Sequence, residues 1–175
     1  MHDETVESWT NKVAHAGVWA MQLTFLEFAH DLNEDYKPAW SEVDFVFGPI
    51  NINEHWLMAA IDLWKSTIFV FNSMLDYIRA DIVNPRLQLL SGAIPSILIA
   101  GGFDTNLPNF KYRPWEVKRS RTTLQWGKSL DCGIFSCKFL EYLVTNINRD
   151  SLNLNNMHVF RKQYVAELWA NKFLW

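Results

Sequence analysis

The chain contains few cysteines, and their number and spacing exclude a disulfide-stabilised secreted domain. Only two are present among 175 residues, whereas small secreted domains rely on several bridges. Cys132 and Cys137 lie five positions apart in a stretch with helical periodicity, so they point to different faces and do not readily pair. Reduced thiols are typical of the intracellular environment. We therefore expect an intracellular protein.

Excess charge and long apolar runs are also lacking. The formal net charge is −3 and the isoelectric point is about 5.9, which gives no electrostatic reason to expect nucleic acid as a partner. No uninterrupted apolar run approaches the ~20 residues that span a bilayer. The N-terminus also lacks the basic-then-apolar order of a signal peptide. We expect neither nucleic acid nor a membrane as a partner.

Apolar and aromatic residues, by contrast, are plentiful. Apolar residues make up 49% of the chain and charged residues 20%, and there are nine tryptophans. This composition is typical of a globular protein with a well-formed core. With no repeat, low-complexity tract or linker in view, we expect one domain over residues 1–175.

The most informative stretch leads from a polar loop into Asp131-Cys132-Gly133, followed by a predicted helix from Cys132 to about Val144. Unpaired backbone N–H groups and the helix dipole favour an anion at such a position. The thiolate is therefore favoured over the thiol, and Gly133 leaves room for a carbonyl to approach. Free cysteines are more often inert core residues, so a nucleophile needs a base elsewhere in the chain.

Three β-branched and aromatic runs predict strands, at Val43–Ile50, His55–Leu63 and Ser66–Phe71. A hairpin centred between Leu63 and Trp64 would place His55 directly opposite Asn72, with their Cβ atoms about 4.5–5.5 Å apart. No two-residue turn signature marks that centre. A four-residue loop with a slipped register therefore remains open.

Other elements are predicted from periodicity and from turn residues. Pro85 opens an apolar helix that runs to about Leu98 and ends before Gly101-Gly102. Trp115–Arg119 is expected to be a short edge strand. A final helix over Met157–Lys172 should turn an apolar face inward. That face comprises Phe160, Tyr164, Val165, Leu168 and Trp169. Residues 1–36 show only a weak helical pattern around Trp9 and Val18–Leu23.

Cysteine catalysis requires a base, a group that orients the base, and donors for the oxyanion. The chain offers five imidazoles, His2, His15, His30, His55 and His158. Of these, His55 alone lies at a predicted strand start with a polar residue expected opposite. A histidine is commonly a surface or satisfied core residue, but this placement makes His55 the candidate base for Cys132.

Together these motifs resemble the ubiquitin-like protein protease family. The features are His55-Trp56 after VDFVFGPIN, Asn72 beyond the next strand, Gln125, and Asp131-Cys132-Gly133. This family comprises the SUMO-deconjugating cysteine proteases, and the chain looks most like its expanded plant members. The resemblance extends from about Val43 to Trp169. It implies an α+β, papain-like fold in which a central buried helix packs on a small mixed or antiparallel sheet.

The resemblance also implies roles for particular residues. Cys132 would attack the carbonyl that follows a diglycine terminus, with His55 as general base, Asn72 in the position of the family's acid, and Gln125 as an oxyanion donor. Trp56 would form one wall of the slot that receives the diglycine tail, although an aromatic there could equally belong to the core. No metal or cofactor is implied.

Its implied partner is a ubiquitin-like modifier of the SUMO type and its conjugates. We expect a monomer in the nucleus, the cytoplasm or both. Which modifier is recognised, and whether precursors or conjugates are cut, depends on surface contacts that the motifs do not specify.

Three departures from the family pattern leave an alternative open. Asn72 replaces an aspartate, and Gln125 precedes Cys132 by seven positions where six is usual (132 − 125 = 7). The family's N-terminal tryptophan has no clear counterpart, and Trp9 and Trp19 are the candidates to replace it. We expect the chain to lack part of that N-terminal segment. The alternatives are a catalytically impaired, modifier-binding pseudo-protease and, ranked last, a cysteine-based acyltransferase.

Overall fold

The computed structural model describes residues 39–120, 123, 125, 130–145 and 156–171. The predicted helical pattern in residues 1–36, with Trp9 and Trp19, lies outside this part.

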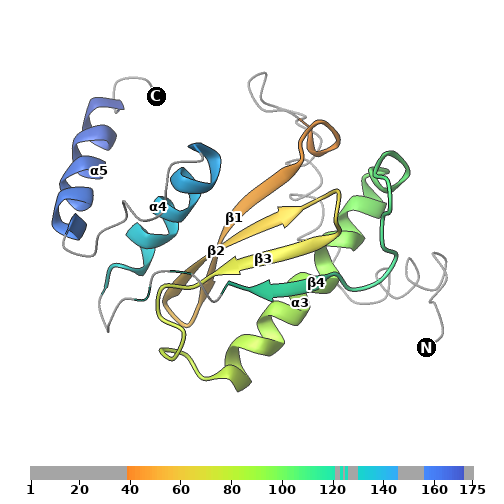
Figure 1. Cartoon of the computed structure of the whole chain (residues 1–175), viewed down its shortest axis with the longest axis horizontal. Coiled ribbons are helices and arrows are strands. Elements are labelled where there is room, and N and C mark those ends of the chain that lie inside the picture. Colours follow the sequence, from red (N-terminus) through yellow and green to blue (C-terminus); the bar gives the residue numbers. More distant parts are fainter. Residues whose placement is uncertain (1–38, 121–122, 124, 126–129, 146–155, 172–175) are drawn as a thin grey trace.

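A mixed sheet has the order β1-β2-β3-β4 (Figure 1). Its strands are β1 (Phe45–Ile52), β2 (His55–Asp62), β3 (Thr67–Phe71) and β4 (Glu116–Arg119). The first three are antiparallel neighbours, and β4 runs parallel to β3 as the predicted edge strand.

A two-residue turn fixes where β2 begins. Asn53 and Glu54 have φ values of 48° and 64°. A hairpin turn of this length needs positive φ at both central residues to match the twist of its strands. The ladder therefore closes with Ile52 opposite His55. The turn thus makes His55 the first residue of β2, where the predicted strand also began.

The β2–β3 hairpin has a different register from the one predicted with His55 opposite Asn72. Asp62 pairs with Thr67 and Met58 with Phe71, which leaves a four-residue loop, Leu63–Ser66. The register with His55 opposite Asn72 is therefore wrong by two positions, whereas the four-residue loop that the sequence left open is confirmed. The Asp62 carboxylate stabilises the longer loop, because it accepts the Lys65 N–H at 2.9 Å and pairs with Lys65 Nζ at 3.0 Å.

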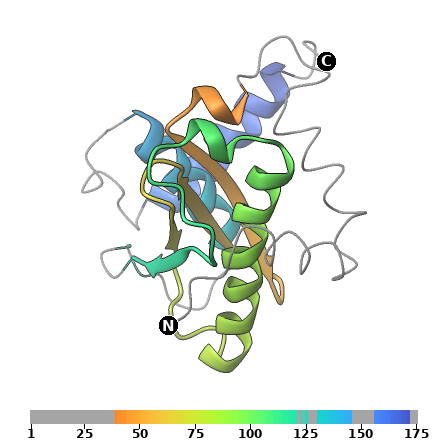
Figure 2. The same ribbon diagram turned by 90° about the vertical axis from the view of Figure 1, so that its right-hand side faces the viewer.

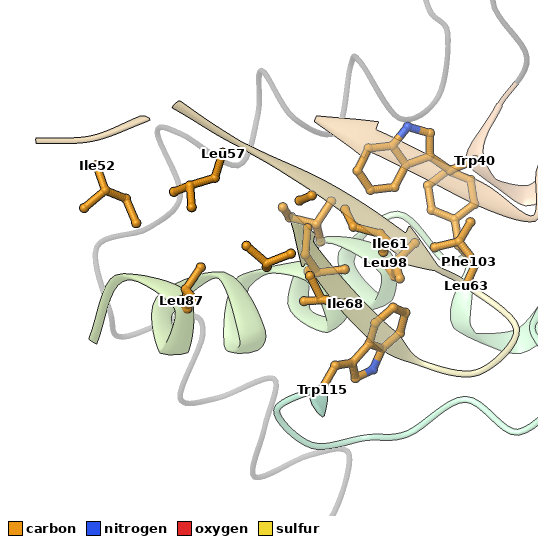
Figure 3. Close-up of a cluster of buried hydrophobic side chains, with 14 of the residues drawn as sticks. Trp40, Ile52, Leu57, Ile61, Leu63, Ile68, Leu87, Leu98, Phe103 and Trp115 are labelled. Atoms are coloured by element: carbon orange, nitrogen blue, oxygen red, sulfur yellow. The ribbon is translucent and has the colours of Figure 1, made fainter. Parts of the chain in front are cut away.

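Helix α3 (Ala80–Ala100) covers one face of the sheet, while α4 (Cys132–Thr145) and α5 (Met157–Asn171) lie on the other (Figures 1 and 2). Successive residues of β2 point to opposite faces. Trp115 packs at the edge of the core between β2, β3 and α3 (Figure 3). This core includes Leu57, Ile61, Ile68, Leu87 and Leu98.

Helix α3 begins five residues before the predicted start at Pro85 (85 − 80 = 5) and contains both Pro85 and Pro95. It ends at Ala100, before Gly101-Gly102, as predicted. By length and composition α3 is the one helix among the described residues that could cross a membrane, but 44% of its most apolar window is buried inside the protein. Its buried side chains belong to the sheet core.

The second core lies between the sheet and α4. Phe135 and Phe139 on α4 pack with Met58 and Ala60 of β2 and with Phe71 of β3. Phe135 is completely buried. The α4 helix begins at Cys132 as predicted. Its packing anchors the first turn of α4 at the end of the sheet where β2 starts.

The inward face predicted for α5 is only partly correct. Val165, Leu168 and Trp169 are 68%, 73% and 67% exposed, whereas Phe160 and Tyr164 are half-buried. Apolar periodicity indicates which residues share a face, but not whether another element covers that face. Polar links largely join α5 to α4. They include Lys138 Nζ to Gln163 Oε1 at 3.3 Å, and Tyr164 to Glu141.

Candidate active site

The start of β2, the end of β3 and the first turn of α4 meet at one end of the sheet (Figure 1). A Cβ atom built on Gly133 would lie 3.7 Å from Cδ1 of Trp56. Trp56 directly follows His55, and Gly133 directly follows Cys132. The fold therefore brings the two candidate catalytic residues to the same corner of the molecule, although they are distant in sequence.

His55 and Asn72 are joined by a hydrogen bond of 2.8 Å between Nε2 and Oδ1. Both residues are buried, at 1% and 3% exposure. Asn72 Oδ1 also accepts the backbone N–H of Met74 at 2.8 Å. Since an amide oxygen only accepts hydrogen bonds, His55 Nε2 must be the donor. This contact fixes the imidazole tautomer that carries its proton on Nε2.

The other ring nitrogen of His55 is therefore the basic one. His55 Nδ1 is buried and has no hydrogen-bond partner. Buried polar atoms without a partner are rare and commonly mark functional positions. No hydrogen bond joins it to Cys132 Sγ in this structure. Catalytic hydrogen bonds are often long until substrate binds, so this nitrogen is placed to receive a proton.

Tyr77 lies against the candidate base. Its ring centroid is 5.3 Å from that of His55, with an interplanar angle of 52°. Tyr77 is 50% exposed, so it covers part of the imidazole while keeping its outer surface in solvent. Sequence reasoning missed this residue, because it lies in the irregular segment between β3 and α3, where no periodicity indicates direction.

Gln125 braces the loop that carries Asn72. Its Nε2 donates to Asn72 O at 2.8 Å and to Thr123 O at 3.0 Å, and its Oε1 accepts the Leu75 N–H at 2.9 Å. Both Gln125 amide hydrogens thus point to backbone carbonyls in this structure. The predicted role of Gln125 as an oxyanion donor stays a prediction.

Cys132 is the first residue of α4 and is 7% exposed. The preceding residue, Asp131, provides the carbonyl that accepts the Phe135 N–H at 2.9 Å. Since the first N–H groups of a helix have no intrahelical acceptor, the N–H of Cys132 is a candidate oxyanion donor. Asp131 Oδ1 also accepts a 2.6 Å bond from Nε of Arg161 on α5, a contact that the sequence did not reveal.

The second cysteine differs in position and chemistry. Cys137 is an exposed free thiol further along α4. Desolvation raises the pKa of its thiol, and the nearby Glu141 carboxylate raises this pKa further. Less thiolate forms at neutral pH as a result, which makes Cys137 a poor nucleophile.

Trp56 is 41% exposed. Its indole faces the first turn of α4 and is not enclosed in the core.

Within the described residues, no group of three or more His, Cys, Asp and Glu side chains gathers as metal ligands would.

A small mixed sheet, a cysteine at the start of a packed helix and a histidine from a neighbouring strand define the papain-like class of cysteine protease folds. Residues 23–170 match the model of the Ulp1 protease family, C-terminal catalytic domain. The chain therefore belongs to the Ulp1 protease family, which confirms the predicted family and the α+β, papain-like fold.

Individual relatives agree with this assignment. A sentrin-specific protease of Caenorhabditis elegans is 28% identical over 131 residues, which cover 75% of this chain but only 17% of that protein. The structure of the SUMO protease Ulp1 with its catalytic cysteine oxidised to a sulfenic acid superposes with a TM-score of 0.53 at 20% identity, covering 86% of this chain and 64% of that one. The Ulp1 protease domain in complex with Smt3, the yeast orthologue of SUMO, superposes with a TM-score of 0.52 at 19% identity. This match covers 96% of this chain and 75% of that one.

Proposed function

We propose that this domain is a thiol peptidase that cleaves after the C-terminal diglycine of a ubiquitin-like modifier such as SUMO. Cys132 is the nucleophile and His55 the general base. The observation that carries this proposal is the His55–Asn72 hydrogen bond, which leaves a buried, partnerless Nδ1 at the corner where α4 begins. Family membership and the Smt3 complex of the related Ulp1 domain support the choice of substrate.

The first chemical step transfers the Cys132 thiol proton to His55 Nδ1. The sulfur attacks the carbonyl carbon of the terminal glycine, a C–S bond forms, and the carbonyl electron pair moves to oxygen. The N–H of Cys132 faces this oxyanion, with the Gln125 amide as a second donor if it turns from its backbone acceptors. Such donors act where negative charge develops in the transition state.

The tetrahedral intermediate then collapses. Its C–N bond breaks, and the leaving amine takes the proton from the His55 imidazolium. The resulting thioester is attacked by water, which loses its proton to Nδ1. Collapse of this second intermediate breaks the C–S bond, and the sulfur takes the proton back from His55. The modifier's carboxylic acid leaves and loses its own proton to solvent. His55 thus acts first as base and then as acid in each half-reaction.

Asn72 orients the base without adding charge. Its oxygen fixes the required tautomer of His55, as the asparagine of Cys-His-Asn proteases does. A neutral amide stabilises the imidazolium less than a carboxylate would. Turnover should therefore be slower than in a protease with aspartate at this position.

The Trp56 indole lies beside Gly133, where a single methyl group would already be in van der Waals contact with its Cδ1. A tail that reaches Cys132 next to this indole has little room for side chains, which fits a diglycine. Trp56 therefore forms one wall of the tail-binding slot.

A catalytically impaired, modifier-binding pseudo-protease is the second candidate. Two observations favour it: the base is oriented by the neutral Asn72, and both Gln125 amide hydrogens are engaged by backbone carbonyls. Such a protein would bind the modifier tail against Trp56 but would release it uncut.

One experiment separates the two candidates. A SUMO-type modifier ending in diglycine and fused to a reporter peptide is incubated with wild-type protein, Cys132→Ala and Cys137→Ser. The proposal expects cleavage after the diglycine by wild type and Cys137→Ser only. Binding without cleavage by folded wild-type protein would support the pseudo-protease.

A further inference from the structure

We infer that Arg161 is a positioning residue for the nucleophile, because it neutralises the Asp131 carboxylate next to Cys132. This inference rests on the proposed role of Cys132. Arg161 belongs to α5, thirty positions beyond Asp131 (161 − 131 = 30), so the contact exists only when α5 is docked. Its effect would be electrostatic and would act through Asp131 on the neighbouring sulfur.

The geometry of the pair is specific. Arg161 Nε donates to Asp131 Oδ1 at 2.6 Å, and Arg161 Nη2 contacts the same oxygen. The Asp131 side chain is 9% exposed and that of Arg161 is 52% exposed. Burying a carboxylate lowers the stability of the folded protein unless a cation and hydrogen bonds compensate its charge. Arg161 provides both.

The location of this carboxylate gives the pair a chemical consequence. Asp131 directly precedes Cys132, whose sulfur must become an anion to attack. A nearby like charge disfavours ionisation, and solvent screens a mostly buried carboxylate only weakly. With Arg161 in place, the local charge is close to balanced, and the helix dipole acts on the thiolate with less opposition.

Among the residues that the structure describes, titratable groups from three elements lie around Cys132. Asp131 precedes it at the start of α4, the imidazole of His55 lies at the start of β2, and Arg161 reaches in from α5. Removing Arg161 changes the charge balance among these groups while leaving the imidazole and its Asn72 contact intact. The thiolate and the Asp131 carboxylate would then repel each other.

Helix α5 has a second attachment to α4 that does not depend on Arg161. Lys138, 3% exposed, donates to Glu141 at 2.6 Å and to Gln163 on α5 at 3.3 Å, and its ammonium lies 4.5 Å from the ring centroid of Tyr164. These contacts should hold α5 in place when Arg161 is replaced. The electrostatic role can therefore be tested in a folded protein.

The test measures alkylation of Cys132 by iodoacetamide as a function of pH, in the full chain carrying Cys137→Ser. It uses no modifier, so it is independent of whether the tail is cleaved. For Arg161→Gln we expect the midpoint of the pH–rate profile to rise by about one pH unit, which slows alkylation about tenfold at neutral pH. Arg161→Lys retains the charge and should stay near wild type.

The decisive variants remove the carboxylate. Asp131→Asn alone should not raise the midpoint, and Asp131→Asn combined with Arg161→Gln should return it to near the wild-type value. A purely structural role would lower the unfolding temperature of Arg161→Gln without moving the midpoint. Arg79→Gln, which removes an exposed arginine–aspartate pair, is the matched control and should behave as wild type.

An unchanged midpoint in Arg161→Gln, or a failure of the double variant to restore it, would overturn the inference. If Arg161→Gln does not fold, Arg161→Met, which keeps the aliphatic part of the side chain but carries no charge, takes its place, and the same rise of the midpoint is expected. Normal alkylation profiles combined with no cleavage of modifier fusions would instead refute the proposed function.

Discussion

Asn72 holds His55 through a single oxygen that accepts two hydrogen bonds, from His55 Nε2 and from the Met74 N–H, each at 2.8 Å. The Met74 bond identifies the oxygen end of the amide, and the His55 bond then fixes the imidazole tautomer. The orientation of the base thus depends on a backbone amide two residues beyond the side chain that contacts it.

This relationship predicts opposite effects for two substitutions. Asn72→Asp keeps an acceptor for both hydrogen bonds and adds a charge that stabilises the imidazolium, so kcat for a modifier fusion should rise. Asn72→Ala leaves His55 without an orienting partner and should lower kcat about 100-fold. Steady-state kinetics, with the unfolding midpoint as a check of folding, measures both. Equal activity of all three proteins would refute a role for Asn72 in orienting the base.

Gly133→Ala should raise the free energy of unfolding and lower the rate of modifier cleavage. Alanine removes conformational freedom from the unfolded chain and should stabilise the helix by about 0.4–1 kcal/mol. Its methyl group would lie 3.7 Å from Trp56 Cδ1, which narrows the approach to Cys132. We expect kcat/KM to fall about 100-fold.

The control for this substitution is Gly48→Ala in β1, where a new Cβ would meet no atom within 4 Å. Cleavage by that variant should remain at the wild-type rate. If Gly133→Ala also cleaves normally, the tail does not approach Cys132 past Gly133 and Trp56.

Gln125→Ala tests whether this amide does more than brace the loop. An oxyanion donor acts on the transition state, so kcat should fall about 100-fold while KM changes little. Loss of the contacts to Asn72 O and Leu75 N should also lower the unfolding temperature. A lower unfolding temperature with unchanged kcat would assign Gln125 a bracing role alone.

Cys137 should react slowly with alkylating reagents at neutral pH. Partial desolvation and the Glu141 carboxylate raise its thiol pKa, so the thiolate fraction is small below that pKa and grows as the pH rises through it. Iodoacetamide labelling of Cys137 in Cys132→Ala should therefore accelerate towards alkaline pH. Replacing Glu141 with Gln removes one cause of the raised pKa and should move that acceleration to lower pH.

The sequence predicted the local features of this domain better than their spatial relationships. His55 at a strand start and Cys132 at a helix start followed from residue patterns that span a few positions. The β2–β3 register did not, because the sequence left the loop length open and hydrogen bonds from Lys65 to Asp62 stabilise the four-residue loop. His55 and Asn72 nevertheless meet, since a side chain just beyond the end of β3 can reach across the shifted ladder.

The contacts from distant segments were not visible in the sequence. Arg161 reaches Asp131 only because α5 docks beside α4, and Tyr77 covers His55 only because the segment after β3 folds back over the sheet end. Periodicity in α5 predicted a shared apolar face that includes Val165 and Leu168. It could not predict that both of these side chains stay exposed.

The central claim is that Cys132 attacks a modifier tail with His55 as its base. The most direct test is labelling by a SUMO-type modifier whose C-terminal glycine carries an electrophile. We predict a single covalent adduct on Cys132, retained in Cys137→Ser, absent in Cys132→Ala and formed much more slowly in His55→Ala. Folded wild-type protein that forms no adduct, or forms one on Cys137, would contradict the account.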